Sequence, residues 1–223
     1  MKRAGTAKKH VAAHPNRGRC AKLTAVPRRR RRPEEAEREI LEAAERFLRE
    51  RPFHELTVDE VMSRTGLSRP SFYQYFRDRN ELVIRLVDRL SGELWPMSNR
   101  WFQGAGDSAD DLRRAYAGVV AVWIQHGTVL RAISDASTHD PLVEDAYRAL
   151  IRRFVTGTAA RIRVETTAGR IHGLDPETTA EALVGMSERY LNQKLGRVPQ
   201  ADPRAVADTL TRIWLRTLYG RAD

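Results

Sequence analysis

The sequence has little cysteine and no long apolar stretch. Cys20 is the only cysteine in 223 residues, so the chain cannot form an internal disulfide, and the reducing cytoplasm is the compartment we expect. No apolar run approaches the roughly 18–20 residues that a transmembrane helix needs. The basic N-terminal residues also lack the apolar segment of a secretory signal. These absences together predict a cytoplasmic protein with no membrane partner.

Enzyme motifs are also absent. The sequence has no HExxH, no GxSxG and no glycine-rich phosphate loop. Two clusters could be mistaken for catalytic groups. The pair Asp110–Asp111 is explained more simply as a helix start, and the segment Glu188–Tyr190 as a salt bridge on a helix face. The six histidines lack the spacing of metal ligands: His10, His14, His54, His126, His139 and His172. We therefore predict no catalytic residue, no metal site and no cofactor.

Acidic residues are missing from the first 33 positions, which contain 12 Lys and Arg residues. The rest of the chain has 27 basic and 29 acidic side chains, so the net charge of +10 comes from this N-terminal segment. Its composition predicts an arm, residues 1–33, that is disordered when free. One interpretation is a solvated leader. The other, which we favour, is an arm that neutralises DNA phosphates with Arg28, Arg29, Arg30, Arg31 and Arg32.

The alternating pattern of β-strands is absent over any useful length, and helix signals fill the chain from Pro33 onward. Three Asp-Pro pairs place an N-cap residue before a proline and predict helices that begin at about 141, 176 and 203. Another helix is expected from about 108 to 126, followed by a separate short helix over 128–137. The fold class is therefore all-α, with about nine helices.

Three short helices before residue 80 have the punctuation of a helix-turn-helix. Thr57 begins the second of them with a capping box, and Gly66 is expected to end it in the left-handed conformation. Ser68 then caps the third helix, and Asp78 begins the next capping box. The motif is expected over residues 57–76.

The third helix has three aromatic residues in five positions. At about 100° per residue, Phe72 and Phe76 share the face that packs on the first two helices, while Ser71 and Gln74 point away from it. Small polar groups near base edges, with hydroxyls and guanidiniums near phosphates, suit a DNA major groove. The alternative is an ordinary amphipathic hairpin with a solvated face. The predicted DNA contacts in this region are Thr57, Ser68, Arg69, Pro70, Ser71, Tyr73, Gln74, Tyr75, Arg77 and Arg79.

The segment TVDEVMSRTGLSRPSFYQYFRDRNEL resembles the N-terminal domain of the TetR family of bacterial transcriptional regulators, and the resemblance covers about residues 34–90. It departs at Met62 and Thr65, where the family usually has alanines, and at Arg79, where the family usually has a phosphate-binding lysine. The resemblance implies a DNA-binding domain over 34–80 and a ligand-binding and dimerisation domain over 81–223.

RPFHELTVDEV, LSRPSFYQYF, MSERYLN and TRIWLRTLYG further resemble a mycobacterial branch of the same family. This resemblance implies an apolar ligand channel and a homodimer through the last two helices, at about 176–195 and 203–219. A polar remnant near Ser187 and Glu188 is expected to orient a ligand. Without the resemblance, the aromatic residues would be read as core. The implied channel lining is Leu112, Val119, Trp123, Ile151, Phe154, Gly157, Thr158, Val184, Ser187 and Trp214.

Two hypotheses of function remain open. The first is a repressor that binds double-stranded, palindromic operator DNA and is released by a hydrophobic small-molecule effector. The second is a constitutive dimeric DNA-binding or architectural protein without a physiological ligand. The size of the C-terminal region favours the first, because roughly 130 residues are far more than a helix pair for dimerisation needs.

Overall fold

The computed structural model describes residues 32–104 and 106–220, and the part of the chain from Arg32 onward forms one compact unit. The predicted phosphate contacts Arg28 to Arg31 lie outside the described residues. We call residues 32–78 the head and residues 79–220 the body. The domain boundary expected at residue 80 stays a prediction.

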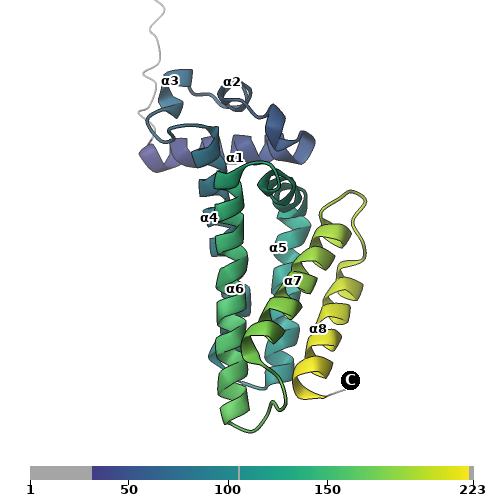
Figure 1. Ribbon diagram of the computed structural model, residues 1–223. Helices are drawn as coiled ribbons and strands as arrows, with labels where there is room; N and C mark the ends of the chain where they lie inside the picture. The colour runs from purple at the N-terminus through teal and green to yellow at the C-terminus, as the bar shows by residue number, and fades with distance from the viewer. Residues whose placement is uncertain (1–31, 105, 221–223) are drawn as a thin grey trace, which may run out of the picture. The chain divides into compact units, whose positions relative to one another are not determined.

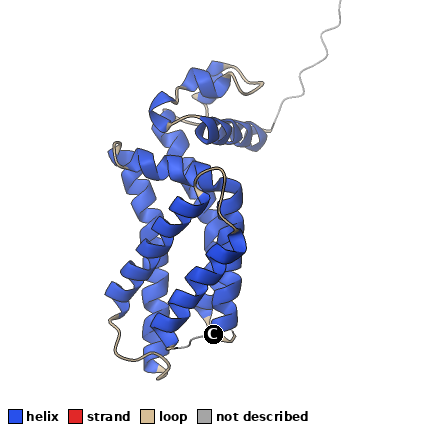
Figure 2. Cartoon of the chain, turned by 90° about the vertical axis from the view of Figure 1, so that its right-hand side faces the viewer, coloured by secondary structure: helices blue, strands red, loops and turns tan. Residues whose placement is uncertain are grey.

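The fold class is all-α, as predicted, and no strand occurs in the described residues (Figure 2). Eight α-helices and one short 3₁₀ helix, η1, follow one another along the chain. Their bounds are α1 (Pro33–Glu50), η1 (Phe53–Glu55), α2 (Val58–Met62), α3 (Arg69–Phe72), α4 (Arg79–Gln103), α5 (Ser108–Ser137), α6 (Pro141–Thr167), α7 (Pro176–Leu195) and α8 (Pro203–Tyr219). None of the helices in the described ranges is long and apolar enough to cross a membrane.

Most of the predicted helix starts are confirmed by their caps, and the exception is Ser68 before α3. The Thr57 hydroxyl accepts a hydrogen bond from the backbone N–H of Glu60 at 3.2 Å, and the Asp78 carboxylate accepts one from Glu81 at 2.9 Å. The aspartates of the three Asp-Pro pairs likewise cap α6, α7 and α8. Each cap satisfies donors that the first turn of a helix leaves without partners, which is why local sequence identifies these positions.

The separate helix expected over 128–137 does not exist, because α5 runs without interruption from Ser108 to Ser137. Gly127 lies inside it. A Cβ atom at this position would lie 2.3 Å from the backbone oxygen of Leu195. The glycine therefore lets the end of α7 approach α5 closely and does not end a helix.

The left-handed conformation predicted for Gly66 is also wrong. The glycines with positive φ are Gly104, Gly169, Gly173 and Gly220, and Gly66 is not among them. Helix α2 already ends at Met62, and the turn after it is held by the Gly66 N–H, which donates to the Glu39 carboxylate of α1 at 2.7 Å.

One hydrophobic core connects the helices of the head and the body. Helix α1 packs on α4 and α5 and lies across their head-side ends in Figure 1. Within the body, α4 packs on α5 and α6, α6 packs on α7, and α8 packs on α5. Helices α4 and α5 are therefore the elements through which the two parts contact each other.

Candidate functional site

The outer surface of the helix-turn-helix is built on two buried phenylalanines. Phe72 and Phe76 are 0% and 1% exposed, and their ring centroids lie 5.4 Å apart. A helix of four residues such as α3 is not stable alone, so this packing holds it in place. Pro70 and Gln74 are exposed on the opposite side, and Tyr73 is 53% exposed.

The predicted polar contacts around α3 are partly engaged within the chain. The Ser68 and Ser71 hydroxyls lie 2.9 Å apart, and Ser68 does not cap the backbone of α3. Arg69 lies 3.1 Å from the Asp59 carboxylate. The pKa of the Arg69 guanidinium is raised, first by a hydrogen bond with the Tyr73 side chain and second by the charge of Asp59. These contacts connect the exposed side of α3 to α2.

The remaining predicted contacts lie at the start of α4 and beside α3. Arg79 donates to the backbone oxygen of Leu56 at 3.1 Å and lies over the Phe53 ring, 5.1 Å from its centroid, so it holds the chain before α2. Arg77 pairs with Asp78 at 3.3 Å and is exposed, and Tyr75 is half-buried against the core. Contacts between these residues and DNA remain predictions.

A buried ionic cluster joins the head to the body, and sequence reasoning missed it. Glu45 of α1 is 3% exposed and lies 2.5 Å from both Arg49 and the Nδ1 atom of His126 on α5. It also pairs with Arg89 of α4. The other ring nitrogen of His126 lies 3.2 Å from Glu93 of α4. We call these five residues the Glu45 joint.

A signal for the joint was present in the sequence. Glu45 falls on the apolar stripe of α1, four residues after Leu41 and three before Leu48, which are both buried. A carboxylate within such a stripe needs buried partners. The sequence could have identified the glutamate as buried, but its partners Arg89 and His126 are 44 and 81 positions further along the chain.

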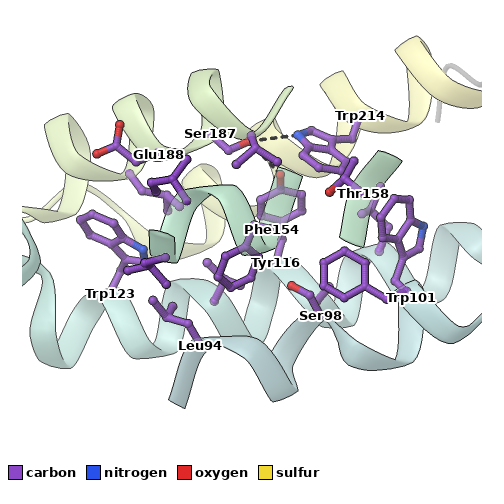
Figure 3. A pocket seen from close by; sticks show the side chains of 18 of the residues that line it. Leu94, Ser98, Trp101, Tyr116, Trp123, Phe154, Thr158, Ser187, Glu188 and Trp214 are labelled. Carbon is purple, nitrogen blue, oxygen red and sulfur yellow. Dashed lines mark hydrogen bonds between the residues drawn. The ribbon is translucent and has the colours of Figure 1, made fainter. Parts of the chain in front are cut away.

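The body encloses an aromatic cavity of about 100 Å³ between α4, α5, α6, α7 and α8 (Figure 3). Nine of the ten residues implied by the resemblance line it: Leu112, Val119, Trp123, Ile151, Phe154, Thr158, Val184, Ser187 and Trp214. Sequence reasoning missed Trp101 and Tyr147, which also line it. Their helical spacing did not distinguish a cavity wall from ordinary core.

Gly157 is the exception and does not line the cavity. A Cβ atom at this position would lie 3.0 Å from Trp95 and 3.3 Å from Phe102, whose rings stack with centroids 4.8 Å apart. The glycine therefore faces an aromatic stack and not free space. A large aromatic side chain at residue 157 would displace this stack before it filled the cavity.

Ser187 organises the polar part of the cavity wall. Its hydroxyl donates to the backbone oxygen of Leu183 at 2.8 Å and accepts from Trp214 Nε1 at 2.9 Å, while the Tyr116 hydroxyl lies 2.8 Å away (Figure 3). Burial raises the pKa of Tyr116 far above the usual value of a phenol, so its hydroxyl stays protonated and acts as a donor. The network fixes the Trp214 ring in the wall.

The cavity is lined mainly by apolar and aromatic side chains. Within the described ranges, no group of three or more His, Cys, Asp and Glu residues could hold a metal ion. The cavity instead offers aromatic surface with a few oriented polar groups, which is the usual composition of a small-molecule site. Because α4 both borders the cavity and contacts α1, occupation of the cavity has a physical route to the head.

Two family models match the chain. Residues 40–86 match the bacterial regulatory proteins of the tetR family, and residues 112–220 match the C-terminal domain of the transcriptional regulator EthR. The HTH-type transcriptional regulator EthR of Mycolicibacterium smegmatis is 31% identical over 215 residues, which are 90% of this chain and 95% of that protein. EthR of Mycobacterium tuberculosis is 30% identical over 211 residues, 90% of this chain and 97% of that protein.

Solved structures share the fold. A TetR-family regulator from Syntrophomonas wolfei superposes with a TM-score of 0.72 at 11% identity, covering 83% of this chain and 95% of that one. A second, from Rhodococcus sp., gives 0.66 at 20% identity, with 83% and 99% covered. A regulator from Saccharomonospora viridis, solved in complex with choline, gives 0.64 at 19% identity, with 84% and 100% covered.

Proposed function

Since the chain belongs to the TetR family of bacterial transcriptional regulators, we propose that it is a cytoplasmic repressor released from a palindromic operator by a small organic molecule. The observation that carries this proposal is the aromatic cavity in the body, bordered by α4. Proteins seldom leave such space in a close-packed interior without a use for it. Regulators of this family are not enzymes.

DNA recognition is assigned to the exposed side of α3. Gln74 presents an amide that matches the adenine edge in the major groove, and Ser71 and Pro70 make smaller contacts. The phenol groups of Tyr73 and Tyr75 and the nearby arginines contact phosphates and set the register. The residues of the N-terminal arm, Arg28 to Arg32, add contacts that do not depend on sequence.

The proposed dimer forms through the outer faces of α7 and α8. Ala182, Gly185 and Arg189 are exposed along one side of α7, and Ile213 of α8 is 37% exposed. A Cβ atom at Gly185 would meet nothing within 4 Å. The small residues Ala182 and Gly185 allow a helix of a second copy to approach closely. The two copies of α3 then enter successive major grooves, roughly 34–36 Å apart.

Release follows from a competition between two states of the dimer. A ligand shifts the equilibrium only by the difference between its affinities for the two states. Filling the cavity moves α4, whose residues Leu94, Ser98 and Trp101 line it, and the Glu45 joint transmits that movement to α1. The choline complex of the Saccharomonospora viridis regulator supports a small organic ligand for this fold.

In vitro selection from random double-stranded DNA, with the full chain, tests the proposal. We expect enrichment of a two-fold symmetric sequence. A thermal-shift screen of small organic molecules then identifies cavity ligands, because a molecule that binds only the folded state stabilises it by mass action. These ligands should weaken binding to the selected operator. Selection of an operator that no cavity ligand affects would favour the constitutive DNA-binding protein.

A further inference from the structure

The cavity has one charged group. Glu188 of α7 is the only Asp, Glu, Lys, Arg or His residue among the 20 that line it. One oxygen of its carboxylate, Oε1, accepts from the Tyr147 hydroxyl at 2.6 Å and from Asn192 Nδ2 at 3.3 Å. Within the described residues, no hydrogen bond reaches Oε2, and no Lys, Arg or His nitrogen lies within 4.0 Å of the carboxylate. The charge therefore has neutral donors but no counter-ion in this part of the chain.

Building on the proposed function, we infer that the effector is an organic cation, with its positive nitrogen beside Glu188 and its apolar body among the aromatic rings. Glu188 lies at the same end of the cavity as Trp123, while Trp101 and Trp214 lie at the other end (Figure 3). Aromatic ring faces attract cations, and a carboxylate adds direct charge pairing. The two features together select a positive charge at the Glu188 end.

The preference over a neutral ligand follows from desolvation. Glu188 is half-buried, so water reaches part of its side chain, and the residue also lines the cavity. A neutral molecule that fills the cavity removes this water and leaves a carboxylate without a counter-ion, which is unfavourable. A cation of the same shape replaces the water with an opposite charge. An anion would face repulsion in addition to the loss of water.

Glu188 also has a structural role, since it orients Tyr147 and Asn192. Burial, and then the Glu188 charge, raise the pKa of Tyr147 well above its usual value, so that hydroxyl remains a donor. Glu188→Gln keeps an oxygen that accepts both hydrogen bonds and removes only the charge. This substitution therefore separates a charge-selecting role from a purely structural one.

The test compares two probes of nearly the same shape, phenyltrimethylammonium and tert-butylbenzene, which differ by one positive charge. Binding to the full chain is measured by calorimetry and by the fluorescence of the cavity tryptophans. We expect the cation to bind the wild type at least tenfold more tightly than the neutral probe. In Glu188→Gln, the ratio of the two affinities should fall close to one, because the cation loses its opposite charge while the neutral probe keeps or gains affinity.

Glu181→Gln is the matched control, since it removes the same charge from an exposed position of α7 that does not line the cavity. The inference is overturned if the wild type binds the neutral probe as tightly as the cation, if it binds neither, or if the preference for the cation survives in Glu188→Gln. Operator release by neutral molecules alone would overturn the inference and leave the proposed repressor function intact. If in vitro selection yielded no operator sequence, that result would instead contradict the proposed function itself.

Discussion

The head and the body use the same type of side chain in opposite ways. In the head, Phe72 and Phe76 are packed so closely that almost none of their surface is exposed, and they fix a helix of only four residues. In the body, Phe154 and Trp123 border free space, although the helices there are 17 to 30 residues long. Close packing makes one rigid surface, whereas incomplete packing leaves room for a ligand.

The comparison predicts that the head is rigid and that the body changes conformation. The head presents a fixed arrangement of donors and acceptors to DNA, so it should tolerate little change in its interior. Under the proposed function, the body exists in two arrangements of similar free energy, and a ligand in the cavity stabilises one of them. The Glu45 joint lies where the two parts meet and is expected to couple them.

The largest expected effect is a loss of stability that differs between a closely packed phenylalanine and one that lines the cavity. Phe72→Ala should lower the free energy of unfolding by about 3–5 kcal/mol, the usual cost of removing a fully buried phenylalanine. Phe154→Ala, the same substitution at a partly exposed residue of the cavity wall, should cost less than about 3 kcal/mol, because part of the ring already faces open space. Urea denaturation of both variants measures the two values. Equal costs would remove the distinction between head and body.

Glu45→Gln should weaken the connection between the two parts. Loss of this buried charge leaves Arg89 and His126 with Glu93 as their one remaining carboxylate within the Glu45 joint and should cost about 2–3 kcal/mol of stability. The folded variant should bind cavity ligands as the wild type does, while the ligands affect operator binding less. Isothermal calorimetry with and without operator DNA measures both affinities. Glu42→Gln, at an exposed position of α1, is the control.

Gln74→Ala should lower affinity for the selected operator by about 1–3 kcal/mol and should change binding to random DNA much less. Tyr73→Phe removes a proposed phosphate contact and should weaken binding to both kinds of DNA to a similar extent. Fluorescence anisotropy at one fixed salt concentration compares them. If Gln74→Ala weakened binding equally on both kinds of DNA, Gln74 would not read a base.

The smallest effect tests the proposed dimer face. Gly92 in α4 and Gly185 in α7 are both exposed helical glycines with nothing within 4 Å of an added Cβ atom. Gly92→Ala should raise stability by about 1 kcal/mol through helix propensity alone. Gly185→Ala should instead weaken dimerisation, measured by sedimentation, because its methyl group meets the partner helix. A similar gain in stability at both positions, with the dimer unchanged, would place the interface elsewhere.

The sequence predicted most features that depend on neighbouring residues, although the Gly66 conformation and the Ser68 cap were wrong. The caps of Thr57 and Asp78 and the Asp-Pro helix starts depend on contacts within one turn of a helix, and all of them are confirmed. The separate helix predicted over 128–137 and the predicted place of Gly157 in the cavity lining differ from the structure for one shared reason, which concerns Gly127 and Gly157. Each glycine faces a residue far along the chain, Leu195 or Trp95, and periodicity within one helix contains no information about such a neighbour.

The prediction of the cavity lining depended on more than helical periodicity. Trp123 and Trp214 have the helical spacing of ordinary core residues, and it was the family resemblance that assigned them to a channel. The Ser187 network that fixes Trp214 joins three helices. Contacts between distant segments also limited the prediction of the Glu45 joint. The position of Glu45 in the apolar stripe of α1 could be recognised in the sequence, but its distant partners could not.

The central claim is that cavity occupation and operator binding oppose each other. Fluorescence anisotropy of labelled operator, titrated with the full chain in the absence and presence of a saturating cavity ligand, tests it most directly. The account predicts at least a tenfold loss of operator affinity. Because coupling is reciprocal, operator DNA should lower the affinity for the ligand by the same factor. A ligand that stabilises the protein yet leaves operator affinity unchanged would contradict the account.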